Sequence, residues 1–287
     1  MAGTGAEGGD TVAGADRVHL HSLDRGLLAL EFLASQGSVR PPDLAAKLGV
    51  DRASAYRILR TLARRGYAVA HPDDHAFAIN PARLYDLTSD LNRSLRWPAV
   101  AQQFLVRLHH ATGQTANLGM LDGGEVVYIS QELSRGPVIV DLLGQRRPAN
   151  CSALGKAILA WSPADAVPAG WRLVRLTERS ITDWPALSAD LDQTRRRGYA
   201  LDDGETFDGV RCVAAPIRDG SGSVVAALGI SGPTTDLPDA TLRGLAGDVV
   251  QCARAVAQAL GYPRERLPAT ATAEPTAQEG AVDDQSS

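Results

Sequence analysis

The chain has 287 residues, of which 44% are hydrophobic and 22% charged, and its formal net charge is −4. This composition is ordinary for a soluble globular protein, and the length is sufficient for two domains. No apolar run approaches the roughly 18–20 residues of a membrane span, and the acidic, glycine-rich N-terminus lacks the features of a signal peptide. The three cysteines are widely spaced, which argues against a disulfide framework or a zinc finger and favours a cytoplasmic protein.

The N-terminal residues 1–16 offer little that could form a core, so we expect them to be disordered. Residues 21–35 have the spacing of an amphipathic helix with two leucine-rich stripes. Two stripes exceed what one small domain must bury. One of them is therefore predicted to pack against a second subunit.

Residues 41–66 spell two short helices joined by a tight turn. Gly49 fits a left-handed helix end, and Asp51 suits the N-cap of the next helix. The short turn is typical of a helix-turn-helix, whose second helix enters the DNA major groove. The buried face of that second helix is predicted from apolar residues at helical spacing, namely Ala55, Ile58, Leu59 and Leu62. The opposite face is left for solvent or DNA and carries Arg52, Ala53, Ser54, Tyr56, Arg57 and Arg60.

Residues 67–70 and 76–79 flank a Pro/Asp turn and are predicted to form a hairpin, which completes a winged helix-turn-helix over residues 17–79. His71 and His75 lie at the wing tip, either as DNA contacts or as ordinary turn residues. Residues 17–67 hold nine basic and four acidic side chains within an acidic chain. Such a basic module is typical of a nucleic-acid binder, although a solvated charged helix would have the same composition.

Residues 80–97 are predicted to form a linker helix that ends at Trp97-Pro98. From 98 to 262, two hairpin patterns alternate with helical patterns, which indicates an α+β domain with an antiparallel sheet. Within this domain Ser152 is a candidate N-cap of a helix over residues 151–160. Residues 263–287, rich in Pro, Ala, Thr and Glu, are expected to be a disordered tail.

Several short strings, collinear over about residues 20–262, together resemble the IclR-type family of bacterial transcriptional regulators. They include Ser22-Leu-Asp-Arg-Gly-Leu27, Ala55-Tyr-Arg-Ile-Leu-Arg-Thr-Leu62, Ala153-Leu-Gly-Lys-Ala-Ile-Leu159 and Gly209-Val-Arg-Cys-Val-Ala-Ala-Pro216. The resemblance implies a GAF-like effector-binding domain over residues 98–262. It also implies a homodimer or dimer of dimers that binds pseudo-palindromic double-stranded DNA, and a small-molecule effector such as an organic or aromatic acid.

By the same resemblance, the residues that contact DNA are Arg40, Arg52, Ala53, Ser54, Tyr56, Arg57 and Arg60. Ala53 stands where a serine is usual, so it could instead contact a thymine methyl. In the effector domain, the backbone amides of Ala153 and Leu154 are expected to bind a carboxylate. Asp202, Val210, Cys212 and Ser231 are expected to line the opposite wall. Gly229 replaces a serine found in many relatives, which suggests extra room and a bulkier or less polar effector.

Three other interpretations compete with this one. Cys212 could be a nucleophile of a cysteine-dependent enzyme, or it could bind a metal with Cys151, although no base or third ligand is evident. The helix-turn-helix could serve only to dimerise a signalling module. Asp202 and Asp203, with Glu205, could form a carboxylate pair or a solvated loop, and we assign Asp202 to ligand contact and Asp203 to the surface. We favour a ligand-controlled transcriptional regulator, a repressor rather than an activator, with no enzyme activity, cofactor, metal or membrane association.

Overall fold

The computed structural model describes residues 20–71, 75–134 and 141–263. It divides into two compact units, one ending at Ser94 and the other beginning at Leu95, so the division falls within the predicted linker 80–97. The segments 1–16 and 263–287, expected to be disordered, lie outside the described residues apart from Pro263. Among the described residues, no helix combines the length and the apolar character needed to span a membrane.

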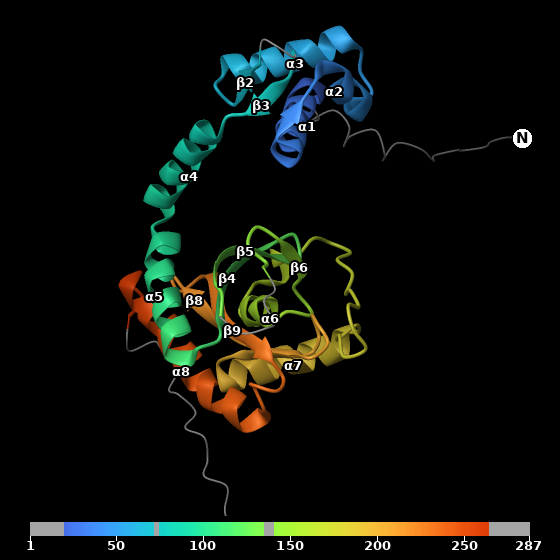
Figure 1. Cartoon of the computed structure of the whole chain (residues 1–287). Helices are drawn as coiled ribbons and strands as arrows, with labels where there is room; N and C mark the ends of the chain where they lie inside the picture. The colour runs from blue at the N-terminus through green and yellow to red at the C-terminus, as the bar shows by residue number, and fades with distance from the viewer. Residues whose placement is uncertain (1–19, 72–74, 135–140, 264–287) are drawn as a thin grey trace, which may run out of the picture. The chain divides into compact units, whose positions relative to one another are not determined.

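The first unit contains the predicted winged helix-turn-helix (Figure 1). Gly49 has the left-handed conformation expected after the first helix of the pair, and the Asp51 carboxylate caps the second helix by accepting the Ser54 N–H at 2.8 Å. Ala55 and Leu59 are fully buried, as the apolar spacing predicts. The helices are α1 (His21–Gln36), α2 (Pro41–Leu48), α3 (Arg52–Arg64) and α4 (Pro81–Leu95). The strands β1 (Ser38–Val39), β2 (Ala68–Ala70) and β3 (Phe77–Ile79) pair in the order β1-β3-β2.

The second unit is built on a six-stranded antiparallel sheet, which confirms the predicted α+β class. Both predicted hairpins are present, with turns at residues 123–124 and 219–223. The strands, in spatial order, are β6 (Arg146–Pro148), β5 (Glu125–Glu132), β4 (Thr115–Asp122), β9 (Val224–Pro233), β8 (Val210–Arg218) and β7 (Ala200–Asp203). The helices are α5 (Trp97–Thr112), α6 (Ala153–Leu159), α7 (Trp184–Arg197) and α8 (Asp239–Ala259), with a short turn of 3-10 helix, η2, at Ala164–Ala166.

Helices cover both faces of this sheet. Side chains alternate along β9, so Leu228 and Ile230 pack with α5 and α8 on one face, while Ala227 packs with α6 on the other. The Ser152 hydroxyl accepts the Gly155 N–H at 2.9 Å, which confirms the predicted cap and fixes where α6 begins. The face that carries α6 also holds the cavity described below.

Candidate nucleic-acid interface and ligand pocket

The exposed face of α3 has a fixed arrangement of polar groups at its start. The Ser54 hydroxyl donates to Asp51 Oδ2 at 2.6 Å and accepts Arg57 Nη2–H at 2.8 Å. These Ser54 hydrogen bonds lower the pKa of Asp51, so the carboxylate is ionised at neutral pH. The chain Asp51–Ser54–Arg57 therefore holds the Arg57 guanidinium on the outer surface of the helix before any DNA is bound.

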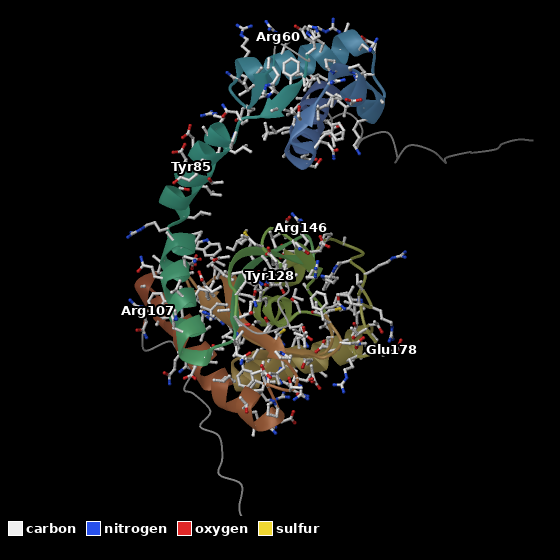
Figure 2. All side chains as sticks on the ribbon, viewed as in Figure 1. Arg60, Tyr85, Arg107, Tyr128, Arg146 and Glu178 are labelled. Atoms are coloured by element: carbon white, nitrogen blue, oxygen red, sulfur yellow. The ribbon has the colours of Figure 1, made fainter. Side chains whose placement is uncertain are left out.

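Four positions occupy the middle of this face. A helix turns 100° per residue, so Ala53, Arg57, Arg60 and Arg64 lie opposite the apolar stripe of the helix, formed by Ala55, Ile58, Leu59 and Leu62. All four are exposed, and Figure 2 shows Arg60 directed outward from α3. Arg64 was missed at the sequence level although it continues the same spacing by one turn.

The remaining predicted DNA contacts lie at the margins of the face. Tyr56 packs edge-on against the Phe77 ring of the wing, with the ring centroids 6.0 Å apart, and is 46% exposed. Arg52 is exposed at the first residue of α3, and Arg40 is exposed just before α2. The Ser54 hydroxyl is engaged by Asp51 and Arg57 rather than free for a phosphate.

A single pocket in the second unit gathers all seven residues that the sequence assigned to an effector. The space between its lining residues that atoms do not fill is about 590 Å³, and this space includes open solvent. Its lining includes Ala153, Leu154, Asp202, Val210, Cys212, Gly229 and Ser231. The sequence did not single out its other members, Thr115, Asn117, Tyr128, Leu142, Thr206, Phe207, Val213, Ala214, Ile230 and Gly232.

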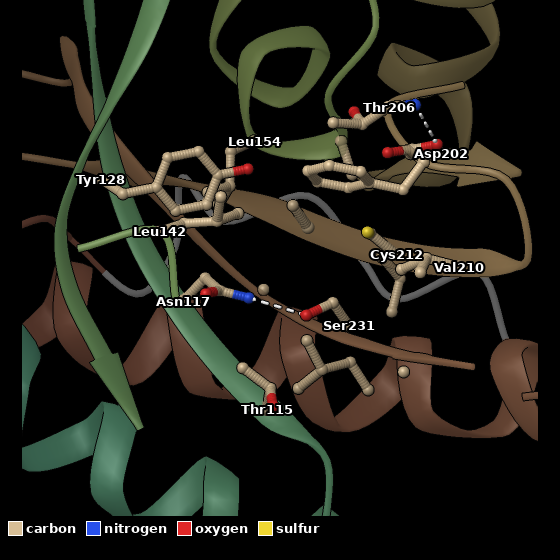
Figure 3. A pocket seen from close by; sticks show the side chains of 17 residues that line it. Thr115, Asn117, Tyr128, Leu142, Leu154, Asp202, Thr206, Val210, Cys212 and Ser231 are labelled. Atoms are coloured by element: carbon tan, nitrogen blue, oxygen red, sulfur yellow. Dashed lines mark hydrogen bonds between the residues drawn. The ribbon is translucent and has the colours of Figure 1, made fainter. Parts of the chain in front are cut away.

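One end of the pocket holds a buried carboxylate (Figure 3). Asp202 Oδ1 accepts the backbone N–H of Glu205 at 2.6 Å and of Thr206 at 3.3 Å. Burial nevertheless raises the pKa of Asp202 above its usual value. The carboxyl group can share a hydrogen bond with a hydroxyl or a similar group on a ligand.

The other end is organised by a hydrogen-bond chain that crosses strands. Gln131 Nε2 donates to Asn117 Oδ1 at 2.8 Å, and Asn117 Nδ2 donates to Ser231 Oγ at 3.0 Å (Figure 3). Gln131 Oε1 in turn accepts the Leu142 N–H at 3.1 Å. This chain fixes the Ser231 hydroxyl as an acceptor toward Asn117 and leaves its proton available to a ligand.

Between these ends the lining is mostly apolar. Figure 3 shows the Tyr128 ring beside Leu142 and Leu154, and the Cys212 side chain below Asp202. Burial raises the pKa of the Tyr128 hydroxyl, which stays protonated. Among the described residues that line this pocket there is no lysine, arginine or histidine. Hydroxyl, amide and carboxyl groups supply its polar side-chain contacts.

The structure does not support the extra room expected at Gly229. A Cβ at this position would lie 2.4 Å from the Val213 carbonyl oxygen and 2.8 Å from the Ala214 Cβ. The missing side chain therefore allows a close approach of β8 to β9 instead of opening the cavity. The inference of a bulkier effector from Gly229 loses its physical basis.

The alternative chemistries find no support in the geometry. Burial raises the pKa of the Cys212 thiol well above its usual value, with the carboxyl of Asp202 as a further cause, so the thiol stays protonated. In the described part of the chain no cluster of three or more His, Cys, Asp or Glu side chains is arranged to hold a metal ion. Asp203 lies at the surface in ion pairs with Arg179 and Arg211, as expected for its solvated role.

Comparison with known proteins covers both units. Residues 22–72 match the IclR helix-turn-helix domain, and residues 93–258 match the bacterial transcriptional regulator IclR C-terminal domain. The chain is 36% identical over 239 residues to the HTH-type transcriptional regulator BhcR of Paracoccus denitrificans, covering 82% of this chain and 85% of the relative.

Solved structures of IclR proteins have the same fold as this chain. The IclR protein of Thermotoga maritima superposes with a TM-score of 0.68 at 27% identity, over 85% of this chain and 100% of that one. An IclR homologue from Microbacterium hydrocarbonoxydans, solved in complex with 4-hydroxybenzoate, superposes with a TM-score of 0.71. That likeness covers 83% of this chain and 98% of the homologue, and at 22% identity it concerns the fold.

Proposed function

The chain belongs to the IclR family of bacterial transcriptional regulators, and on that premise we propose how it recognises DNA and what controls it. Like its relatives it is a DNA-binding regulator and not an enzyme. The exposed face of α3 enters the major groove of a pseudo-palindromic operator. Arg57 and Arg60 contact guanine edges or phosphates there, while Arg52 and Arg40 contact the backbone. Regulation is by repression, in the cytoplasm.

The pocket is the observation that supports control by a small-molecule effector. Seven residues assigned from sequence converge on one cavity with polar groups at both ends and an apolar middle. This lining suits a small molecule with a flat or aliphatic body and hydrogen-bonding groups at its two ends. A hydroxylated organic or aromatic acid has this chemistry, and an IclR homologue is known in complex with 4-hydroxybenzoate.

The proposed effector lies with a hydroxyl group toward Asp202, which accepts its proton. Its carboxylate lies toward the Ser231 hydroxyl at the other end, in place of the backbone amides of Ala153 and Leu154 expected from the sequence. The Thr115 hydroxyl is already engaged with Ser134. The orientation follows from charge, because a ligand carboxylate placed against Asp202 would be repelled. Binding alters operator affinity by favouring one of two conformations, and we assign α4 as the transmitter.

The quaternary structure proposed is a homodimer or a dimer of dimers. Two leucines on one face of α1 are unusually exposed for their size: Leu23 is 58% and Leu27 52% accessible. Covering this apolar stripe with a second copy removes it from water, and a two-fold dimer matches a palindromic site. Light scattering at micromolar concentration checks this, since a monomer would contradict it.

Fluorescence anisotropy with DNA from upstream of the chain's own gene tests the DNA-binding proposal. Scrambled DNA of equal length is the control, and both are measured at two salt concentrations. Nanomolar, sequence-selective and salt-sensitive binding is expected. Absence of binding to any DNA at low salt would refute the proposal.

A further inference from the structure

A buried cluster of charged side chains lies directly behind one wall of the pocket. Lys156 Nζ is 2.5 Å from Glu205 Oε1 and 3.2 Å from Asp190 Oδ2, and the side chains of Lys156 and Glu205 are only 1% and 9% exposed. Glu205 Oε2 is buried without a hydrogen-bond partner, and Asp190 Oδ2, although 3.2 Å from the ammonium nitrogen, accepts no hydrogen bond either. Arg197 Nη2 lies 3.6 Å from Asp190 Oδ1, and Asp202 is the third carboxyl group near Glu205, so two cations face three carboxyl groups.

The cluster joins two parts of the pocket lining. Lys156 lies on α6, whose first residues Ala153 and Leu154 line the pocket. Glu205 lies in the segment 204–207, from which Thr206 and Phe207 line it. The ion pair between Lys156 and Glu205 thus ties the segment 204–207 to α6.

The same segment is held at its backbone by neutral hydrogen bonds. The Ser180 hydroxyl donates to the Glu205 carbonyl at 2.8 Å, and the Thr177 hydroxyl donates to the Gly204 carbonyl at 2.7 Å. These bonds do not change between pH 6 and pH 8. Any pH dependence in the position of this segment must therefore come from the charged groups.

We propose that Glu205, paired with Lys156 beside Asp190, is a proton-operated latch that holds the segment 204–207 as a closed wall of the pocket. Proton uptake by Glu205 leaves two carboxylates, Asp190 and Asp202, opposite the two cations Lys156 and Arg197, so the cluster becomes neutral. Loss of that proton leaves an excess negative charge in a site from which water is excluded. The inference rests on the proposed function only in assigning the pocket to an effector.

The pKa of Glu205 in the folded protein decides how the stability of the closed segment depends on pH. Burial raises the pKa of Glu205 from 4.5 to about 7, and this outweighs the attraction of Lys156. Glu205 binds a proton more tightly when the segment is closed than when it opens to water. The closed wall is therefore most stable at acid pH and loses stability as the pH rises through 7. The ionisable groups facing Glu205 are Lys156 on α6, Asp190 on α7, Asp202 on β7 and the thiols of Cys151 and Cys212, with Arg197 3.6 Å from Asp190.

Amide hydrogen exchange of the full chain, without DNA or effector, tests the latch. The Glu205 and Thr206 amides report on the closed segment because both donate to Asp202. A carboxyl with a pKa near 4.5 when open and near 7 when closed makes opening about tenfold more frequent at pH 8 than at pH 6. Protection factors, corrected for intrinsic exchange, are expected to fall by that factor in the wild type.

Two variants separate Glu205 from other titrating groups. Glu205→Gln keeps the shape of the side chain and should show protection that does not change between the two pH values. Asp203→Asn removes a neighbouring surface carboxylate and should behave as the wild type. The latch is overturned if wild-type protection is equal at both pH values. It is also overturned if the pH dependence persists in Glu205→Gln, which would assign it to Asp202 instead, as Asp202→Asn would show. Because no DNA or ligand is present, a failure here is distinct from a failure of the proposed function.

Discussion

Replacing Arg57 with alanine tests how α3 recognises DNA. Arg57 lies in the middle of the exposed face, and Ser54 holds its guanidinium in place. In the proposed dimer both subunits carry the substitution, so it removes one contact from each of the two operator half-sites. A bidentate guanine contact is worth about 1–3 kcal/mol of discrimination, so the two half-sites together lose about 2–6 kcal/mol of operator preference. Two phosphate contacts instead lower the slope of log affinity against log salt by about 1.8.

We expect the base-contact result for Arg57, because a central position on the helix faces the floor of the groove. Operator affinity then falls while affinity for scrambled DNA and the salt slope change little. Anisotropy titrations at four salt concentrations distinguish the two cases. Arg179→Ala, which removes an exposed arginine of the second unit that pairs with Asp203, is the matched control. If Arg57→Ala binds the operator as Arg179→Ala does, α3 does not recognise DNA in this way.

Three further predictions concern the second unit and the linker. Gly229→Ala should lower stability by about 1–3 kcal/mol, because its Cβ would lie 2.4 Å from the Val213 carbonyl oxygen. Gly244→Ala on α8, where a Cβ meets nothing within 4 Å, should not destabilise. Calorimetric unfolding of both variants checks this, and equal melting temperatures would count against the close approach of β8 and β9. The thiol of Cys212, whose pKa burial raises well above its usual value, should resist iodoacetamide at pH 8 under native conditions. Rapid site-specific labelling in mass spectra would restore the nucleophile interpretation. Prolines at Thr88 and Leu91 of α4 should preserve operator binding but abolish the effector response, so an unchanged response would exclude α4 as the transmitter.

The helix-turn-helix could be predicted almost completely because its signals are local. Capping by Asp51, the left-handed Gly49 and the i, i+3, i+4 spacing of Ala55, Ile58 and Leu59 each act within one or two turns. The structure has all of these features where the sequence places them. What local signals could not show is that Ser54 holds Arg57, since that depends on the rotamers of both side chains.

The pocket shows the opposite situation. Its residues come from strands and loops far apart in the chain, and the family resemblance rather than any local pattern brought Asp202, Cys212 and Ser231 together. Asn117 was missed because an asparagine in a strand of alternating pattern gives no signal of its own. The short strands β6 and β7 were missed for a related reason: three or four residues are too few to establish a period.

Gly229 shows where resemblance misleads. Comparison of side-chain sizes suggested that glycine adds room, but the position of β8 depends on that glycine. Likewise, nothing in the sequence indicates that Lys156 and Glu205 are buried. They lie 49 positions apart, and only tertiary packing brings them together as an ion pair.

The central claim is that a ligand in the pocket changes operator affinity. Aromatic and aliphatic hydroxy acids, 4-hydroxybenzoate among them, are screened for compounds that raise the melting temperature, and each such compound is titrated into the operator complex. The account predicts that at least one changes operator affinity by fivefold or more. It also predicts that Val210→Trp, which fills the pocket, binds the operator normally but no longer responds. A compound that alters operator affinity equally in the wild type and in Val210→Trp would contradict the account, as would a screen in which no stabilising compound changes it.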